Sequence, residues 1–202
     1  MNKADYKIPS ESIEHTYEIK KSEFIARAHY VQNRQQAMDF LAQARKDYPD
    51  ARHHCWAYQL GNPNSPSNAA FNDDGEPSGT AGKPILNVLS HKDIGDIMVI
   101  VIRYFGGIKL GAGGLVRAYS TATQQAVELL KTELQIAKES VTFIASYADE
   151  KDIRHFCQQH EADVLSVEYG THIEIRCAFP LQAVETIQNF VDGRIDITLK
   201  TD

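Results

Sequence analysis

The most restrictive feature of the sequence is an apolar run that leads into a glycine-rich loop. Residues 97–102 read Ile-Met-Val-Ile-Val-Ile, and five glycines fall within the nine residues 106–114. A helical pattern follows over residues 115–123. A buried strand, a loop and a helix in this order place unpaired backbone N–H groups and the positive end of a helix dipole at one point. The order therefore predicts an anion-binding site at the loop.

Basic residues accompany this loop. Arg103 ends the expected strand, Lys109 lies inside the loop, and no acidic residue occurs between Asp96 and Glu128. Such a cluster can position an anion. The alternative is ordinary solvated charge beside glycines that only permit a tight turn. The residues predicted to bind an anion or nucleic acid are Lys83, Arg103, Lys109, Gly111, Gly113, Gly114 and Arg117.

Known nucleotide-binding and metal-binding motifs do not match. A phosphate-binding G-x-x-x-x-G-K-[ST] motif fails because Ala112 stands in place of the lysine, and a dinucleotide-binding G-x-G-x-x-G motif fails at Val116. A calcium-binding EF-hand loop fails at Ala70 and Ala81. A turn is the favoured interpretation of the acidic run at residues 73–76. The sequence therefore predicts neither a metal site nor a cofactor.

A catalytic centre is not predicted either. His54 and Cys55 are neighbours on an expected strand, so their side chains point to opposite faces. Ser78 does not lie in the G-x-S-x-G turn of a hydrolase. The cysteines Cys55, Cys157 and Cys177 are odd in number and form no C-x-x-C pair. Each is interpreted as a small buried hydrophobic residue in a reducing cytoplasm.

Length and composition are those of a globular protein with a core. The 202 residues suffice for one large domain or two small ones, and 43% of them are hydrophobic. No apolar run approaches the ~20 residues that span a bilayer. The N-terminus lacks the apolar region of a signal peptide. We therefore expect a cytoplasmic protein with no membrane contact.

The net charge of −6 belongs to the C-terminal third of the chain. Residues 1–136 contain fifteen basic and fifteen acidic residues, whereas residues 137–202 contain six and twelve. An acidic chain of this kind can still carry a basic patch on its N-terminal part.

The N-terminal part reads as a mixture of strands and helices. Alternating apolar and polar residues predict two antiparallel strands joined by a tight turn at Lys21-Ser22. The next helix is expected to have Asn33 as its N-cap and to end at Pro49. Residues 61–72 are polar and are expected to form a long loop. Strands are predicted at residues 14–20, 22–31, 54–60 and 97–104, and helices at residues 34–48, from residue 84, and from the glycine loop to about residue 131.

The C-terminal part has the element order βαββαβ, which is typical of a ferredoxin-like domain. The boundary is expected near residue 135, giving domains at residues 1–135 and 136–202 of an α+β protein. Strands are predicted at residues 138–147, 163–169, 172–179 and 195–199, and helices at residues 150–160 and 181–191.

Two segments resemble the signature of a known family. One reads Asp-Asp-Gly-Glu-Pro-Ser-Gly-Thr-Ala-Gly-Lys-Pro over residues 73–84, and the other reads Val-Ile-Arg-Tyr-Phe-Gly-Gly-Ile-Lys-Leu-Gly over residues 101–111. Both closely resemble the Impact family, and the whole chain looks like its bacterial two-domain, YigZ-type branch. The motif loop consists of Asp73, Asp74, Gly75, Glu76, Pro77, Ser78, Gly79 and Thr80.

The resemblance implies a fold and a field of function. The first domain is expected to be similar to the second domain of ribosomal protein S5, and the second domain to a late domain of translocation factor EF-G. Eukaryotic relatives, which carry a different accessory domain, restrain a translation-regulating kinase by competing for its activator. The resemblance therefore implies a non-enzymatic, translation-associated binding or regulatory protein. The expected partner is RNA, the ribosome or a translation-related protein, and the oligomeric state is not predicted.

RNA phosphate is an anion that the predicted binding residues can position. Tyr104, Phe105 and Tyr119 can stack on unpaired bases or, alternatively, pack in the core. A second hypothesis is an enzyme or sensor for a small phosphorylated ligand, because the loop is similar to the phosphate loop of GHMP kinases. Those kinases carry Ser-Ser-Ala where residues 114–116 read Gly-Leu-Val. A third hypothesis is a protein-interaction adaptor that uses the acidic C-terminal domain.

Overall fold

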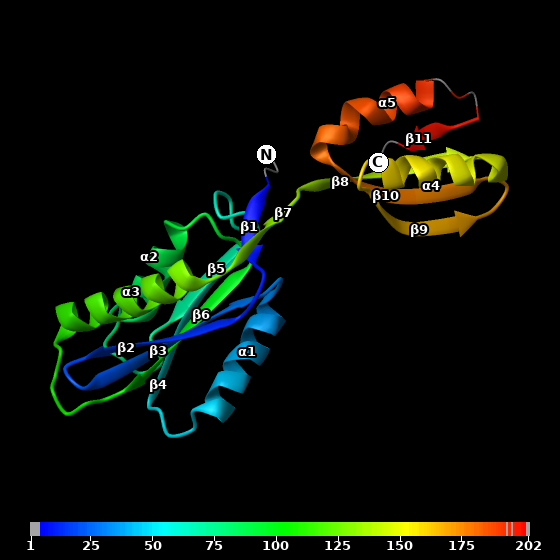
Figure 1. Cartoon of the computed structure of the whole chain (residues 1–202). Coiled ribbons are helices and arrows are strands. Elements are labelled where there is room, and N and C mark those ends of the chain that lie inside the picture. The colour runs from blue at the N-terminus through cyan, green and yellow to red at the C-terminus, as the bar shows by residue number, and fades with distance from the viewer. Residues whose placement is uncertain (1–4, 193, 195, 201–202) are drawn as a thin grey trace. The chain divides into compact units, whose positions relative to one another are not determined.

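The computed structural model describes residues 5–192, 194 and 196–200. These residues form two compact units, one comprising Asp5–Gln135 and the other beginning at Ile136 (Figure 1). Each unit combines sheets and helices, as expected for an α+β protein.

The first unit is built on a five-stranded antiparallel sheet with β6 at its centre. All residues of β6 except the last are buried, because helices cover both faces of the sheet. This burial explains why β6 reads as an unbroken apolar run. In spatial order the strands are β2 (Ile13–Ile19), β3 (Ser22–Tyr30), β6 (Ile97–Tyr104), β4 (His53–Leu60) and β5 (Asn68–Asn72).

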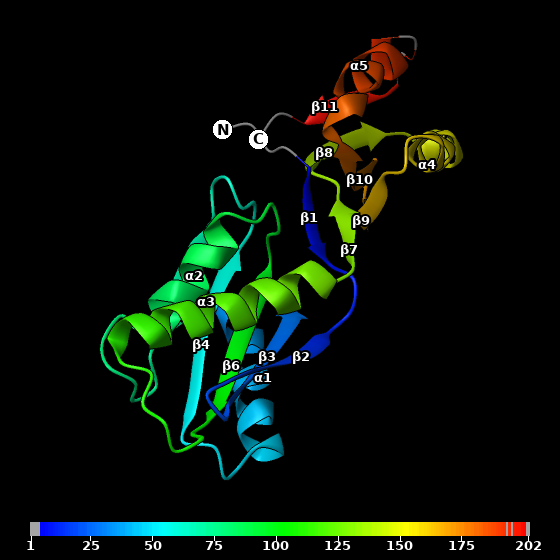
Figure 2. The ribbon, with the colours of Figure 1, turned by 60° about the vertical axis from the view of Figure 1, so that its left-hand side comes forward.

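The helices of this unit lie on opposite faces of the sheet (Figure 2). The helices α2 (Gly82–Ser90) and α3 (Ala112–Leu129) pack against one face, where Phe24 contributes to the core. The helix α1 (Arg34–Asp47) packs against the other face, where Ile25 contributes. Alternation along β3 therefore supplies both cores, as the sequence pattern predicts.

The predicted helix cap is present, and the predicted hairpin turn is displaced by one residue. Asn33 caps α1 by accepting a hydrogen bond from the Gln36 N–H at 3.0 Å. The β2–β3 hairpin turns at Lys20 and Lys21, one residue before the predicted position. Both residues have positive φ angles, 49° and 63°. A two-residue hairpin loop requires this backbone form in order to match the twist of the strands.

One expectation for this unit is wrong, and one strand pair was missed. Residues 68–72, expected within a loop, form the edge strand β5, whose backbone pairs with β4. The helix α3 ends at Leu129, and a strand pair that was not predicted joins β1 (Tyr6–Pro9) to β7 (Thr132–Gln135). These short strands each have a single neighbour and bury few side chains, so their sequences lack an apolar repeat.

The second unit has the predicted element order, and its four strands are all antiparallel. The sheet order is β11-β8-β10-β9, and the core includes Phe143, Ile153 and Phe179. The last strand is shorter than predicted, and Ile195 lies outside the described residues. The elements are β8 (Lys138–Ala145), the 3₁₀ turn η1 (Tyr147–Asp149), α4 (Glu150–Gln159), β9 (Asp163–Tyr169), β10 (Ile173–Pro180), the 3₁₀ turn η2 (Leu181–Ala183), α5 (Val184–Asp192) and β11 (Thr198–Lys200).

Candidate functional site

A cleft of about 680 Å³ lies where the glycine loop meets two other segments of the first unit. One wall is the segment at residues 50–53 that leads into β4. The end of β6, residues 109–111 of the glycine loop and the start of α3 form the rest of the walls. Glu76 and Pro77 of the motif loop complete the lining.

The floor of the cleft holds a buried ion pair. Arg103 Nη1 lies 2.6 Å from Glu76 Oε1, and the two side chains are 9% and 4% exposed. The Tyr119 hydroxyl donates a hydrogen bond to the same oxygen at 2.9 Å. The rings of Phe24 and Phe105 lie 5.5 and 5.6 Å from the guanidinium carbon of Arg103. Arg103 is therefore anchored within the floor of the cleft.

One donor in this floor is left without a partner. Arg103 lines the cleft, and its Nε has no hydrogen-bond partner among the described residues. A buried donor that stays unpaired costs about 1–3 kcal/mol.

The wall formed by α3 presents backbone N–H groups. The helix begins at Ala112, so Gly113 and Gly114 form its first turn instead of extending the loop. Gly111 precedes the helix with a φ of 70°, and no side chain of the described residues caps this end. The first N–H groups of a helix lack intrahelical partners. They are therefore free to bind an anion, and Gly111 and Ala112 line the cleft.

Gly106 has a packing role. A Cβ atom on Gly106 would lie 1.9 Å from the carbonyl carbon of Lys21, and the Gly106 N–H donates to Ser22 Oγ at 3.0 Å. This glycine is required because the loop crosses the β2–β3 turn at close range. Here the purely structural interpretation of the glycines holds.

The predicted cations separate into two groups. Lys109 is exposed and lines the cleft together with Arg103. Lys83 is exposed on α2 and does not line the cleft. Arg117 is exposed on α3, and its Nη1 lies 3.8 Å from the position that a Cβ on Gly113 would take. Arg117 therefore lies along the first turn of the helix, outside the cleft.

The three aromatic candidates also differ. Phe105 lines the cleft and is 56% exposed, and the partly buried Tyr104 lines it as well. Tyr119 is fully buried and packs edge-on against Phe24 with ring centroids 5.1 Å apart. Tyr119 therefore cannot stack on a base, and the alternative of core packing is correct for it.

Sequence reasoning missed the wall at residues 50–53. Asp50, Arg52 and His53 line the cleft although they lie about 50 positions before the glycine loop. Pairing of β4 with β6 places His53 opposite Arg103 and so brings this segment to the loop. Only the order of the strands in the sheet could have revealed this wall, and local sequence patterns do not contain that order.

Comparison with known proteins identifies the family. Residues 20–127 match the family model of the Impact N-terminal domain. An IMPACT family member from Haemophilus influenzae is 35% identical over 200 residues, which cover 97% of each chain. The chain belongs to the Impact family.

Further similarities of this Impact-family chain extend over most of its length. The IMPACT family member YigZ from Escherichia coli is 37% identical over 177 residues, covering 88% of this chain and 87% of that protein. A crystal structure of a hypothetical protein is similar with a TM-score of 0.80 and 33% identity, covering 98% of both chains. Residues 143–192 match a domain of unknown function, DUF1949. The predicted family resemblance is thereby confirmed.

The Impact motif loop at residues 73–80 holds Glu76 in the cleft. The Asp73 carboxylate accepts hydrogen bonds from the N–H groups of Gly79, Ala81 and Gly82 at 2.8–3.0 Å, which ties the loop to the start of α2. Asp74 Oδ2 accepts from the His54 N–H at 2.7 Å, which ties the loop to β4. Within the described part of the chain, no group of three or more His, Cys, Asp or Glu residues is arranged to hold a metal.

The cysteines are buried, as predicted. Cys55 Sγ donates to the Asp73 carbonyl at 2.9 Å, and burial raises the pKa of the Cys55 thiol. A thiol of this kind is a poor nucleophile. His54, its neighbour, points to the opposite face of β4, as alternation predicts, and lies in the α1 layer with a pKa lowered by burial.

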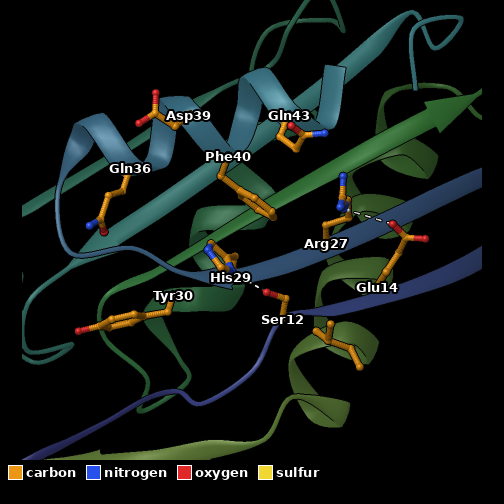
Figure 3. Close-up of a pocket in the computed structure, with 10 residues that line it drawn as sticks. Ser12, Glu14, Arg27, His29, Tyr30, Gln36, Asp39, Phe40 and Gln43 are labelled. Atoms are coloured by element: carbon orange, nitrogen blue, oxygen red, sulfur yellow. Dashed lines mark hydrogen bonds and ion pairs between the residues drawn. The ribbon is translucent and has the colours of Figure 1, made fainter. Parts of the chain in front are cut away.

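A second hollow, of about 650 Å³, lies on the other face of the sheet between α1 and the β2–β3 hairpin (Figure 3). Phe40 points from α1 toward β3, and its ring stacks on His29 with centroids 4.8 Å apart. Arg27 is paired with Glu14 at 3.2 Å and with Asp47 at 2.6 Å. The Arg27 guanidinium is therefore already neutralised by carboxylates of the protein.

None of the helices in the described ranges has both the length and the apolar character needed to cross a membrane.

Proposed function

We propose that this Impact-family chain is a translation-associated binding protein that contacts RNA through the cleft at the glycine loop. The observation that carries the proposal is the uncapped start of α3, where Gly111 and Ala112 line the cleft together with the exposed Lys109. The first backbone N–H groups of α3 and the Lys109 ammonium supply hydrogen-bond donors where a phosphate group would bring acceptors.

The charges on the rim favour the same ligand. Among the described residues, neither Arg52 nor Lys109 has an ion-pair or hydrogen-bond partner, and both line the cleft. The acids that line the cleft are Asp50 and Glu76, and Glu76 is paired with Arg103. Phe105 adds an exposed ring beside these cations, and such a ring can stack on an unpaired base.

The link to translation follows from the family resemblance. The proposed S5-like and ferredoxin-like folds support it, because the resemblance relates both to proteins that work on the ribosome. The βαββαβ order and the sheet order β11-β8-β10-β9 support the ferredoxin-like assignment of the second unit.

The test is binding of a fluorescent single-stranded RNA at several salt concentrations, together with ribosome co-sedimentation. Lys109→Glu and Arg52→Glu are the informative variants, because Arg103 is held by Glu76 and its reversal would disturb folding. We expect each to weaken RNA binding by roughly tenfold at low salt and to reduce the salt slope by about one.

The matched control is Lys83→Glu, which makes the same charge change on an exposed residue outside the cleft. If Lys83→Glu weakens binding as much as Lys109→Glu, RNA responds to overall charge and the cleft is not the site. No binding or co-sedimentation by the wild-type chain at low salt would remove the proposal.

A second candidate is a small phosphorylated ligand, which the volume of the cleft favours, because small-molecule sites are concave and of this size. A ligand of this kind that binds only the folded chain raises the melting temperature. A shift with millimolar ribonucleotides but no retention of RNA would favour this candidate over the first.

A further inference from the structure

His53, which lines the same cleft as Lys109, has a defined hydrogen-bonding state. Its Nδ1 lies 2.9 Å from the backbone carbonyl oxygen of Asp74. A carbonyl oxygen can only accept, so Nδ1 carries the hydrogen, and in the neutral ring Nε2 is then an acceptor. No partner of Nε2 exists among the described residues, and His53 lines the cleft.

The His53 ring is held in place from two sides. The Asp74 side chain bonds to the next residue of the strand, His54, through its N–H at 2.7 Å, which locks the accepting carbonyl to β4. A Cβ on Gly75 would lie 3.5 Å from His53 Nδ1, so the ring packs directly over that glycine. His53 Nε2 is therefore a preorganised acceptor.

The cleft thus contains two kinds of surface. The α3 start, Lys109 and Arg52 donate hydrogen bonds or carry positive charge. His53 Nε2 accepts, and so does the second oxygen of Glu76, because Arg103 and Tyr119 both use Oε1. A simple polyanion or a DNA backbone brings acceptors alone and leaves the second surface unsatisfied. A ribose phosphate also brings hydroxyl donors.

We propose that the cleft selects a ribose phosphate, with the phosphate at the start of α3 and Lys109 and the 2′-hydroxyl donating to His53 Nε2. This inference rests on the proposed RNA-binding function and adds discrimination between RNA and DNA. The 2′-hydroxyl is the group by which a protein distinguishes the two at one position.

The experiment compares one single-stranded oligonucleotide sequence as RNA and as DNA on the same protein at one salt concentration. A hydrogen bond contributes about 0.5–1.5 kcal/mol, so the wild-type chain is expected to bind the RNA roughly two- to tenfold more tightly. A mononucleotide pair, with and without the 2′-hydroxyl, identifies whether one ribose phosphate unit suffices.

The decisive variant is His53→Asn. The asparagine amide can donate to the Asp74 carbonyl as Nδ1 does, but nothing replaces Nε2. This variant is expected to fold and to bind the RNA no more tightly than the DNA. His53→Gln, which can place an amide oxygen near the position of Nε2, is expected to restore part of the preference.

Each outcome separates the two proposals. Equal wild-type affinity for RNA and DNA overturns the selectivity and leaves the RNA-binding cleft intact. A preference that survives in His53→Asn overturns the role of His53. Absence of binding to either strand overturns both proposals.

Discussion

The first unit has two hollows of similar volume, one on each side of its sheet, and they differ in how their charges are used. In the groove under α1, Arg27 is paired with Glu14 and Asp47, and His29 bonds to Ser12. In the cleft at the glycine loop, the ion pair lies in the floor, while Arg52, Lys109 and the α3 start remain uncommitted. The volume of a hollow alone therefore does not identify a binding site. Charged and hydrogen-bonding groups that have no partner within the described residues do.

The largest expected contrast is in stability. Arg103→Met leaves Glu76 buried without its partner, which should lower the free energy of unfolding by about 3–5 kcal/mol. Arg27→Met breaks two partly exposed pairs and should cost about 1 kcal/mol or less. Urea titrations of both variants measure the difference. Equal losses would show that the groove is as tightly built as the cleft.

The second contrast is in RNA binding, with the charge removed in both hollows. Lys109→Gln should raise the Kd for RNA about five- to tenfold, because an uncommitted cation is lost from the proposed phosphate site. Arg27→Gln should leave the Kd within a factor of two, because its charge is already neutralised by two carboxylates. An equal effect of the two variants in fluorescence anisotropy would contradict the assignment of the site to the cleft.

The stability of the chain should also depend on pH through His29, which lines the groove. Burial, together with the nearby Arg27, lowers the pKa of His29 in the folded state below its ordinary value of 6.5. Below pH 6.5 the unfolded chain then binds more protons at His29 than the folded chain does. The contribution of His29 to the free energy of unfolding is therefore fully present above pH 6.5 and is lost as the pH drops through the folded-state pKa. His29→Gln should therefore lose less stability between pH 7 and pH 5 than the wild type, as measured by urea titration at each pH. A steeper loss would reverse this sign.

The smallest effect is expected at the start of α3. Gly113→Ala adds a methyl group in nearly open space, 3.8 Å from Arg117 Nη1, and should stabilise the chain by about 0.4–1 kcal/mol. If the phosphate approaches the backbone here, the same methyl group should weaken RNA binding. A stabilised variant with unchanged RNA affinity would place the phosphate elsewhere along the cleft. Melting curves and anisotropy on one preparation measure both effects.

Much of the fold could be predicted from local patterns. The alternation along β3, the helical repeat of α1 and the Asn33 cap each record a backbone preference or a buried face within a few residues. The edge strand β5 and the β1–β7 pair escaped because their hydrogen bonds go to distant segments. Seven of the residues that line the candidate cleft could be named from the sequence, whereas the segment at residues 50–53 was missed. The seven are Glu76, Pro77, Arg103, Tyr104, Phe105, Lys109 and Gly111.

The sequence by itself determined that a strand, a glycine loop and a helix follow one another, because each of them is indicated by residues that are adjacent in the chain. The tertiary structure alone decided that Arg103 pairs with Glu76, that Tyr119 is buried, and that His53 lines the same cleft as the loop. Those outcomes depend on the pairing of β4 with β6 and on the position of the motif loop. Contacts between segments far apart in the chain leave no periodic trace in either segment, so only the folded chain shows which groups are paired and which are free.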